Sequence, residues 1–199
     1  DASAREIAEM AICLCELTAC NVHELYVPRK VDTRKMQAYG LRPGLCIDLT
    51  SQNMSGDTWD ISKQHDQEKL RTVQDKEKPT LLIGSLPTCI FDPIVGPSSC
   101  SRTGISDEEV ESGKQLLADM CRKQLDAGRH FVCEIPCEAE EAGDQVSFHE
   151  LEGDSRVQVV YGREFKVRRD GKVYVRARSR WITSSEEVAS SLRNFALQS

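Results

Sequence analysis

A thiol stands just beyond the most apolar run of this sequence, in a place where it could do chemistry. Residues 78–85 read Lys-Pro-Thr-Leu-Leu-Ile-Gly-Ser, and Cys89 follows through the rigid turn Pro87-Thr88. Such a run is typical of a buried parallel strand, and open α/β sheets bind their ligands at the carboxyl ends of their strands. Cys89 could therefore act as a nucleophile, or it could be a small buried residue that only packs.

Two acids occupy comparable places. Asp48 stands near the end of the apolar run 45–49, where it could bind a ligand or cap the following loop. Glu134 interrupts the apolar run 130–135, and an acid inside such a run needs a partner or a function. Together with Cys89, these acids predict a functional site at the carboxyl edge of the sheet.

The elements that must position these residues alternate along the chain. Apolar runs followed by turn residues predict strands over 21–27, 45–49, 78–85, 130–135 and 157–161. Capping residues and helical spacing predict helices over 3–19, 32–39, 62–77, 106–128 and from Ser184 onward. Strands that alternate with helices indicate a mostly parallel sheet covered on both faces, and we expect one domain over residues 1–199.

Two segments between these elements are predicted to be loops. Residues 92–103 are rich in Pro, Gly, Ser and Cys, and the length of this loop is typical of lids and binding loops. Residues 138–144 form an acidic, solvated loop.

A C-terminal antiparallel hairpin is predicted around Asp170-Gly171, with strands 164–168 and 172–177. A two-residue turn would place Val167 opposite Tyr174 and mix polar with apolar residues on each face. A three-residue loop would instead pair Val167 with Val173 and Phe165 with Val175, so we expect the three-residue loop.

The hairpin region is basic, whereas the chain as a whole is acidic. The whole sequence has a net charge of -6, whereas residues 163–180 contain eight basic and two acidic side chains. With Tyr174 and Trp181 nearby, the segment could bind the phosphates and stack the bases of DNA or RNA. It could also be the solvated face of an amphipathic hairpin. The candidate nucleic-acid contacts are Arg163, Lys166, Arg168, Lys172, Arg176 and Arg178.

Several other functions are not favoured. The set Cys121, His130, Cys133 and Cys137 fits no common zinc spacing, and His130 and Cys133 fall on opposite faces of a strand, so no metal site is predicted. Asp57-Thr58-Trp59 is not the Asp-Thr-Gly of an aspartic protease. No Ser-His-Asp arrangement or Walker-type glycine loop is evident.

The composition of the chain indicates the redox state of its thiols and its cellular location. Nine cysteines form an odd number, and no Cys-x-x-Cys occurs. These features favour reduced thiols and an intracellular location, in the nucleus or cytoplasm, over a secreted disulfide scaffold. No apolar run approaches the roughly 20 residues that a membrane span needs.

Most of the chain resembles a segment of eukaryotic retrotransposon polyproteins. The resemblance rests on Gly-Leu-Arg-Pro-Gly-Leu-Cys-Ile-Asp-Leu-Thr at 40–50, Thr-Trp-Asp at 58–60, the run 78–85, Ala-Gly-Arg-His-Phe-Val-Cys-Glu-Ile-Pro at 127–136, and Arg-Ser-Arg-Trp-Ile-Thr-Ser-Ser at 178–185. That segment is more distantly similar to cytosine-5 DNA methyltransferases, which have a Rossmann-like fold and use S-adenosylmethionine. The resemblance implies that other parts of a polyprotein are partners of the chain.

The resemblance also implies a cofactor site. Glu24 matches the acid that ends the first strand in the family, where a Gly-rich loop follows; here Val-Pro-Arg-Lys at 27–30 replaces the glycines. Asp48 takes the place of the acid that binds the ribose hydroxyls. Asp60 would lie near the adenine.

For catalysis, the resemblance implies that Cys89 attacks a flipped-out cytosine and that Glu134 binds the base. The retroelement pattern is Gly-Ser-Pro-x-Cys-Thr-x-Phe, and aligning Gly84 and Phe91 with it puts Thr88 where the nucleophile belongs. We therefore expect a methyltransferase-like domain with weak or lost activity. The alternative is a catalytically silent module that binds nucleic acid or assists assembly through the hairpin.

Overall fold

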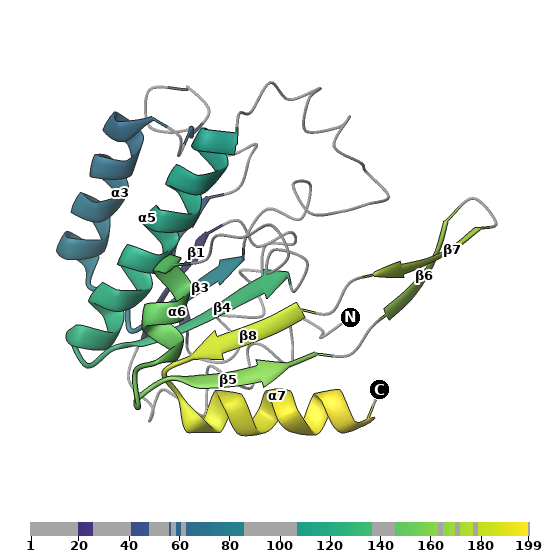
Figure 1. Cartoon of the computed structure of the whole chain (residues 1–199). Coiled ribbons are helices and arrows are strands. Elements are labelled where there is room, and N and C mark those ends of the chain that lie inside the picture. Colours follow the sequence, from purple (N-terminus) through teal and green to yellow (C-terminus); the bar gives the residue numbers. More distant parts are fainter. Residues whose placement is uncertain are drawn as a thin grey trace.

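The computed structural model of the chain describes residues 20–25, 41–47, 56, 59–60, 63–85, 107–136, 146–162, 165–169, 172–176 and 179–198. The helices predicted over 3–19 and 32–39 lie outside these residues, as do the loops predicted over 92–103 and 138–144. Figure 1 shows a twisted sheet with helices packed against it and a separate hairpin that extends away from the sheet.

Six strands form the main sheet, in the order β2-β1-β3-β4-β8-β5. β1 (Cys20–Leu25), β2 (Leu41–Ile47), β3 (Leu81–Ser85) and β4 (His130–Pro136) pair in parallel. β8 (Ser179–Thr183) runs antiparallel to both β4 and β5 (Gln158–Tyr161). The predicted α/β class, with a mostly parallel Rossmann-like sheet, is confirmed.

The larger core lies between one face of this sheet and the helices α3 (Gln64–Glu77), α5 (Asp107–Asp126) and α6 (Val146–Glu152). Leu82, Phe131 and Ile182 project into it from three strands. α7 (Glu186–Gln198) packs against β5 and β8. Val159 contacts the larger core, so its buried neighbour Val160 belongs to the other face, where α7 supplies Val188 and Leu192. Helices thus cover both faces, as the sequence predicted.

Local sequence signals explain where the helices begin and end. α5 buries Leu117, Cys121 and Leu125 on one stripe, and Gly128 follows it with a φ of +66°, as the helix-stop signal predicted. α3 ends at Glu77, and its C-cap Lys78 has a φ of 46° and donates its backbone N–H to the Gln74 carbonyl. Pro79 then prevents any continuation of α3. Ser185 caps α7 by accepting a hydrogen bond from the Val188 N–H at 3.3 Å.

The prediction for the hairpin register was wrong. β6 (Phe165–Arg169) and β7 (Lys172–Arg176) form a two-stranded sheet of their own, in which Val167 faces Tyr174 and Arg168 faces Val173. Asp170 and Gly171 lie outside the described residues, but the pairing of Arg169 with Lys172 leaves two residues for the connection. The three-residue alternative was preferred in order to gather the apolar residues on one face. Because the hairpin forms a sheet of its own, pairing with the main sheet does not select one of its faces, and a two-residue connection allows the observed register.

Two further elements were not predicted. α6 is a single short helix whose Phe148 and Leu151 are buried in the main core. β8 lies in the segment that was noted only for its basic and aromatic residues. Both elements depend on contacts with parts of the chain that are distant in sequence.

Candidate functional site: the carboxyl edge of the sheet

The topology places a switch point between β1 and β3. From β1 the chain continues to β2 on one side of the sheet, whereas from β3 it continues to β4 on the other side. The two connections therefore leave the carboxyl ends of neighbouring strands in opposite directions. In open α/β sheets this divergence forms the crevice in which ligands bind.

Glu24 lies next to this point and is buried within the sheet. The residue is 3% exposed, and its Oε2 atom accepts a hydrogen bond from the Cys46 thiol at 3.2 Å. Glu24 pairs directly with Cys46 on β2 and with Ile83 on β3. A carboxylate is costly to bury, so its retention at this edge marks the position as a candidate binding group.

Glu134 lies on the same face of the sheet as Glu24, two strands away. In the row of Glu24, Ile83 pairs with Val132 on β4, and in the next row toward the carboxyl edge Ser85 pairs with Glu134. Paired residues share a face, so the two acids lie on one side of the sheet. Strand spacing and rise place their Cα atoms about 12 Å apart.

Ser85 and Trp181 flank Glu134 on either side. Ser85 is buried and Trp181 is half-buried, and both pair with Glu134. Neither Ser85 nor Cys46 was selected from the sequence. Each lies near the end of an apolar run, but its proximity to an acid depends on the register between strands, which only the fold provides.

Asp60 lies before α3, at the end of the helix that adjoins the carboxyl edge. Its carboxylate pairs with Lys63 at 3.0 Å and is 38% exposed. Its backbone N–H donates to Oδ2 of the buried Asp66 at 3.1 Å. Asp66 thus holds the backbone of Asp60, whose carboxylate lies partly exposed beside Lys63.

The remaining predicted site residues divide into two groups. Cys89, Asp48, Arg163 and Arg178 lie outside the described residues. Lys166, Arg168, Lys172 and Arg176 lie on β6 and β7, in the separate hairpin. Of the predicted cofactor and catalytic residues, the structure brings Glu24 and Glu134 to the same edge and the same face.

Arg180 is not part of a phosphate-binding surface, although it belongs to the basic segment. The residue is 2% exposed, and its Nε atom lies 3.0 Å from Oε1 of Glu152 at the end of α6. This ion pair joins β8 to α6 inside the protein. One of the eight basic residues counted in the segment therefore has a structural role.

Cys121 and Cys133 also have a packing role. Both are fully buried, on α5 and β4 respectively. Burial raises the pKa of the Cys133 thiol well above its ordinary value, and the neighbouring Cys121 raises it further. The thiol therefore stays protonated and unreactive. Among the described residues, no group of three His, Cys, Asp or Glu side chains could hold a metal ion.

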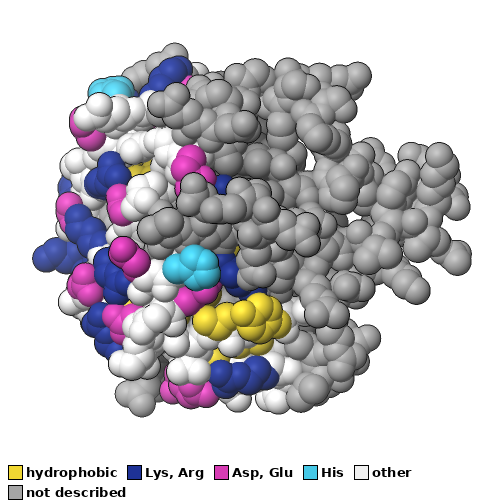
Figure 2. Space-filling view, viewed as in Figure 1, with side chains coloured by type: hydrophobic (Ala, Val, Ile, Leu, Met, Phe, Trp, Pro, Cys, Tyr) yellow, Lys and Arg dark blue, Asp and Glu magenta, His cyan; other side chains and the backbone are white. Residues whose placement is uncertain are grey.

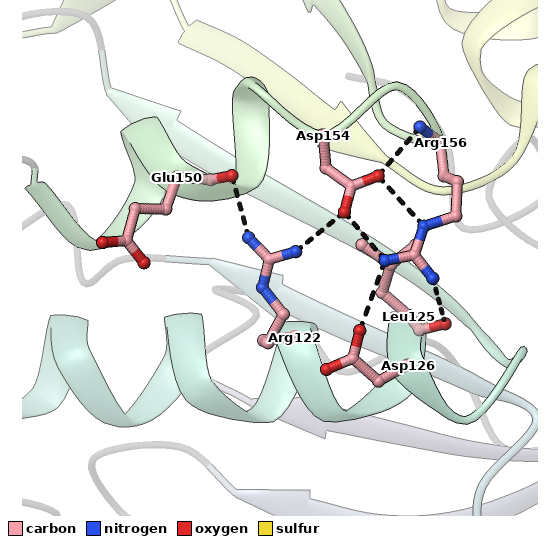
Figure 3. Close-up of polar contacts among 6 residues, drawn as sticks. All are labelled: Arg122, Leu125, Asp126, Glu150, Asp154 and Arg156. Carbon is pink, nitrogen blue, oxygen red and sulfur yellow. Dashed lines mark hydrogen bonds and ion pairs between the residues drawn. The ribbon is translucent and has the colours of Figure 1, made fainter.

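At the other end of the sheet, a polar network joins α5, α6 and the turn that enters β5 (Figure 3). Asp154 accepts hydrogen bonds from the Arg156 side chain at 2.8 and 3.0 Å and from Arg122 at 2.9 Å. Arg122 also donates to the Glu150 carbonyl, and Arg156 donates to the Leu125 carbonyl. These bonds satisfy carbonyls near the ends of two helices, so the network stabilises the fold.

The outer face of α3 and α5 shows no field of a single sign. Figure 2 shows Lys and Arg side chains interspersed with Asp and Glu side chains on this side of the molecule. Arg71 lies 2.9 Å from Asp119, and Lys123 pairs with Asp75. Opposite charges that alternate in this way do not attract a polyanion.

Comparisons with known proteins add little to this description. No family model matches the chain, and no curated protein matches it. Among solved structures, the precorrin 8w decarboxylase of Methanobacterium thermoautotrophicum is similar, with 9% identity over 90% of this chain and 89% of that one. The TM-score of 0.36 is too low for any argument about function. The chain is thus a Rossmann-like α/β protein by its own topology. No helix in the described part is long and apolar enough to cross a membrane.

Proposed function

We propose that this chain is a methyltransferase-like domain of retroelement origin that binds S-adenosylmethionine at the carboxyl edge of its sheet, with weak or lost catalysis. The position of Glu24 supports this most directly, because the residue is a buried acid at the end of β1, beside the switch point. The family that the sequence resembles has an acid at this place. Its carboxylate accepts a hydrogen bond from Cys46 and could likewise accept one from a ligand.

The described residues suit a ligand that donates hydrogen bonds. Glu24 and the partly exposed carboxylate of Asp60 are acceptors, and S-adenosylmethionine carries ammonium and hydroxyl donors. When bound, this cofactor would supply a methyl group attached to a positively charged sulfur. In the proposal Glu24, Asp48 and Asp60 hold the cofactor, and Glu134 orients a base near β4.

Weak or lost catalysis follows from the sequence at two places. Thr88 stands where the nucleophile belongs, so the Cys89 thiol is displaced by one residue, and Val-Pro-Arg-Lys at 27–30 replaces a glycine loop. A small misplacement of a nucleophile strongly reduces the rate of attack. We therefore expect cofactor binding to survive better than methyl transfer.

Calorimetric titration of the full chain with S-adenosylmethionine and S-adenosylhomocysteine tests the proposal. We expect saturable heat below millimolar ligand, weakened at least tenfold by Glu24→Gln. The matched control is Glu150→Gln, since Glu150 is exposed on α6. No heat at millimolar ligand would exclude the cofactor site. Transfer of labelled methyl groups to cytosine-containing DNA, compared with Cys89→Ala, then measures any remaining activity.

The second candidate function is binding of a nucleic acid by the basic hairpin. The specific observation in its favour is that β6 and β7 form their own sheet and carry Lys166, Arg168, Lys172 and Arg176. A projecting pair of strands with these cations can follow a phosphate backbone without the main sheet. This function does not require the cofactor.

Charge reversal tests the hairpin function separately. The triple variant Arg168→Glu, Lys172→Glu and Arg176→Glu is expected to abolish binding of DNA and RNA in an anisotropy assay. The melting temperature should change little, because the hairpin lies outside the main sheet. Unchanged binding in the triple variant would rule out the hairpin as the contact surface.

A further inference from the structure

The observed register gives the two faces of the hairpin different compositions. Cross-strand partners share a face, and successive partners alternate between faces. The first face holds the pairs Phe165–Arg176, Val167–Tyr174 and Arg169–Lys172. The second holds Lys166–Val175 and Arg168–Val173. Both aromatic residues of the hairpin strands therefore fall on the first face, together with three of the five cations.

On the first face, defined by these three pairs, Tyr174 lies between Lys172 and Arg176 along β7, and Phe165 pairs with Arg176 across the strands. Phe165 and Tyr174 are diagonal neighbours, with Cα atoms about 7–8 Å apart. The Arg169–Lys172 pair lies toward the turn, and Arg176 lies at the opposite end of the strands. The predicted three-residue register would instead have formed an all-apolar face from Phe165, Val167, Val173 and Val175. The register that the chain adopts thus places its aromatic residues among charges.

We infer that the first face of the hairpin binds single-stranded nucleic acid, with bases stacked on Phe165 and Tyr174 and with Arg169, Lys172 and Arg176 on the phosphates. This inference rests on the proposed binding of nucleic acid by the hairpin and specifies its ligand. Aromatic platforms within a basic surface are the common means by which proteins bind single strands without reading sequence.

A single strand suits this face better than a duplex. In a duplex the bases are stacked on one another, so the aromatic positions could contribute only after unpairing. A two-stranded ribbon can enter a major groove, but cations and polar groups would be enough for that contact. Aromatic residues placed together with cations favour exposed bases as the ligand.

Trp181 of the main sheet is not part of the proposed site. Trp181 lies on β8, where it pairs with Glu134 and Val160, and the adjacent Arg180 is buried against Glu152. The residues assigned to the proposed site all lie on β6 and β7. Substitutions in the hairpin should leave the fold of the main sheet intact.

Fluorescence anisotropy with the full chain tests the inference, using labelled oligothymidylate and a mixed-sequence duplex of equal length. We expect the single strand to bind at least tenfold more tightly than the duplex. Tyr174→Ala should weaken single-strand binding at least about fivefold, the lower end of the effect of losing one base–aromatic stack. Tyr174→Phe should retain affinity, and Val175→Ala, on the second face, is the matched control.

Heparin, a polyanion without bases, separates stacking from charge. Tyr174→Ala should leave heparin binding unchanged, whereas the triple charge reversal should abolish it. Equal affinity for duplex and single strand, or equal effects of Tyr174→Ala and Val175→Ala, would overturn the stacking face while leaving a phosphate-binding hairpin intact. Absence of binding to both nucleic acids and to heparin would overturn the hairpin function itself.

Discussion

The Nε2 atom of His23 on β1 lies 2.9 Å from the Oε2 atom of Glu77 on α3, and the histidine side chain is almost completely buried. Gly44 on β2 makes room for this ring. Val22 pairs with Pro43 and Glu24 pairs with Cys46, so two residues of β2 stand opposite His23. A bulge and a glycine therefore let a strand histidine reach a helix carboxylate, one position away from Glu24.

Gly44→Ala should destabilise the protein. A Cβ atom at this position would lie 2.3 Å from Cδ2 and 2.7 Å from Nε2 of His23, which the packed ring cannot tolerate without moving. We expect the unfolding free energy in urea to fall by roughly 1–3 kcal/mol, as for other overpacked sites. Gly153→Ala is the control, because its new Cβ would come no closer than 3.5 Å to the His149 carbonyl oxygen. Equal urea midpoints for Gly44→Ala and wild type would contradict this account.

His23 should make stability depend on pH. Burial lowers the pKa of its imidazole below the ordinary 6.5, and Glu77 opposes part of this shift. The unfolded chain therefore takes up a proton at a higher pH than the folded chain. The contribution of His23 to stability is complete above pH 6.5 and is lost as pH falls toward the lower folded pKa.

Urea titrations at pH 7.5 and 5.5 measure this dependence. The wild type should lose more unfolding free energy between the two pH values than His23→Gln, which cannot take up a proton. The comparison concerns the difference between pH values, so a general loss of stability in the variant does not affect it. Parallel pH profiles would show that His23 is not the responsible group.

The sequence was informative where local rules decide the structure. The apolar runs of β3 and β4 and the stop of α5 at Gly128 require only neighbouring residues, and these predictions were correct. α6 was missed because its seven residues are too few to form a stable helix alone. Its stability comes from Phe148 and Leu151 in the core.

Less of the candidate site than of the fold could be predicted from the sequence. Glu134 was selected as an acid inside an apolar strand and Glu24 through the family resemblance, but their common face depends on the registers of β1, β3 and β4. Arg180 was counted with the basic segment because its burial against Glu152 arises only when β8 inserts between β4 and β5. These relationships are properties of strand order, which no local pattern encodes.

Breaking the Arg180–Glu152 pair should be costly. The side chains are 2% and 15% exposed, and removing one partner leaves the other charge in a poorly solvated place. Arg180→Met should lower the unfolding free energy by about 3–5 kcal/mol, and Glu152→Gln should act in the same direction. Lys63→Met removes the exposed pair with Asp60 and should change stability by less than about 1 kcal/mol. Similar urea midpoints for Arg180→Met and Lys63→Met would refute the structural role of Arg180.

Asp154 should stabilise the fold at neutral pH and not in acid. Hydrogen bonds from Arg156 hold the pKa of its carboxyl well below the usual range, with a further contribution from Arg122. The stabilisation is present above the ordinary pKa of about 3.8 and is lost as pH falls toward the lower folded value. Asp154→Asn should therefore cost more stability at pH 7 than at pH 3.

Thermal melts at these two pH values check this expectation, with Glu150→Gln as the control. Arg122 bonds to the backbone carbonyl of Glu150, while the Glu150 carboxylate points away from the network (Figure 3). The Glu150 substitution should thus have little effect at either pH. An equal loss from Asp154→Asn at both pH values would contradict the lowered pKa.

The salt dependence of nucleic-acid binding should report individual hairpin cations. The logarithm of the association constant for a single strand falls with the logarithm of salt concentration by about 0.7 for each phosphate contact. Arg176→Gln should therefore reduce the slope by about 0.7, whereas Arg193→Gln on α7 should leave it unchanged. Arg193 already bonds to Glu186 and Gln158, each at 2.9 Å, and lies outside the hairpin. Slopes measured by anisotropy between 50 and 200 mM salt test whether Arg176 contacts a phosphate. An Arg176→Gln slope equal to that of wild type would remove Arg176 from the phosphate contacts and leave Arg169 and Lys172 as the cations of the first face.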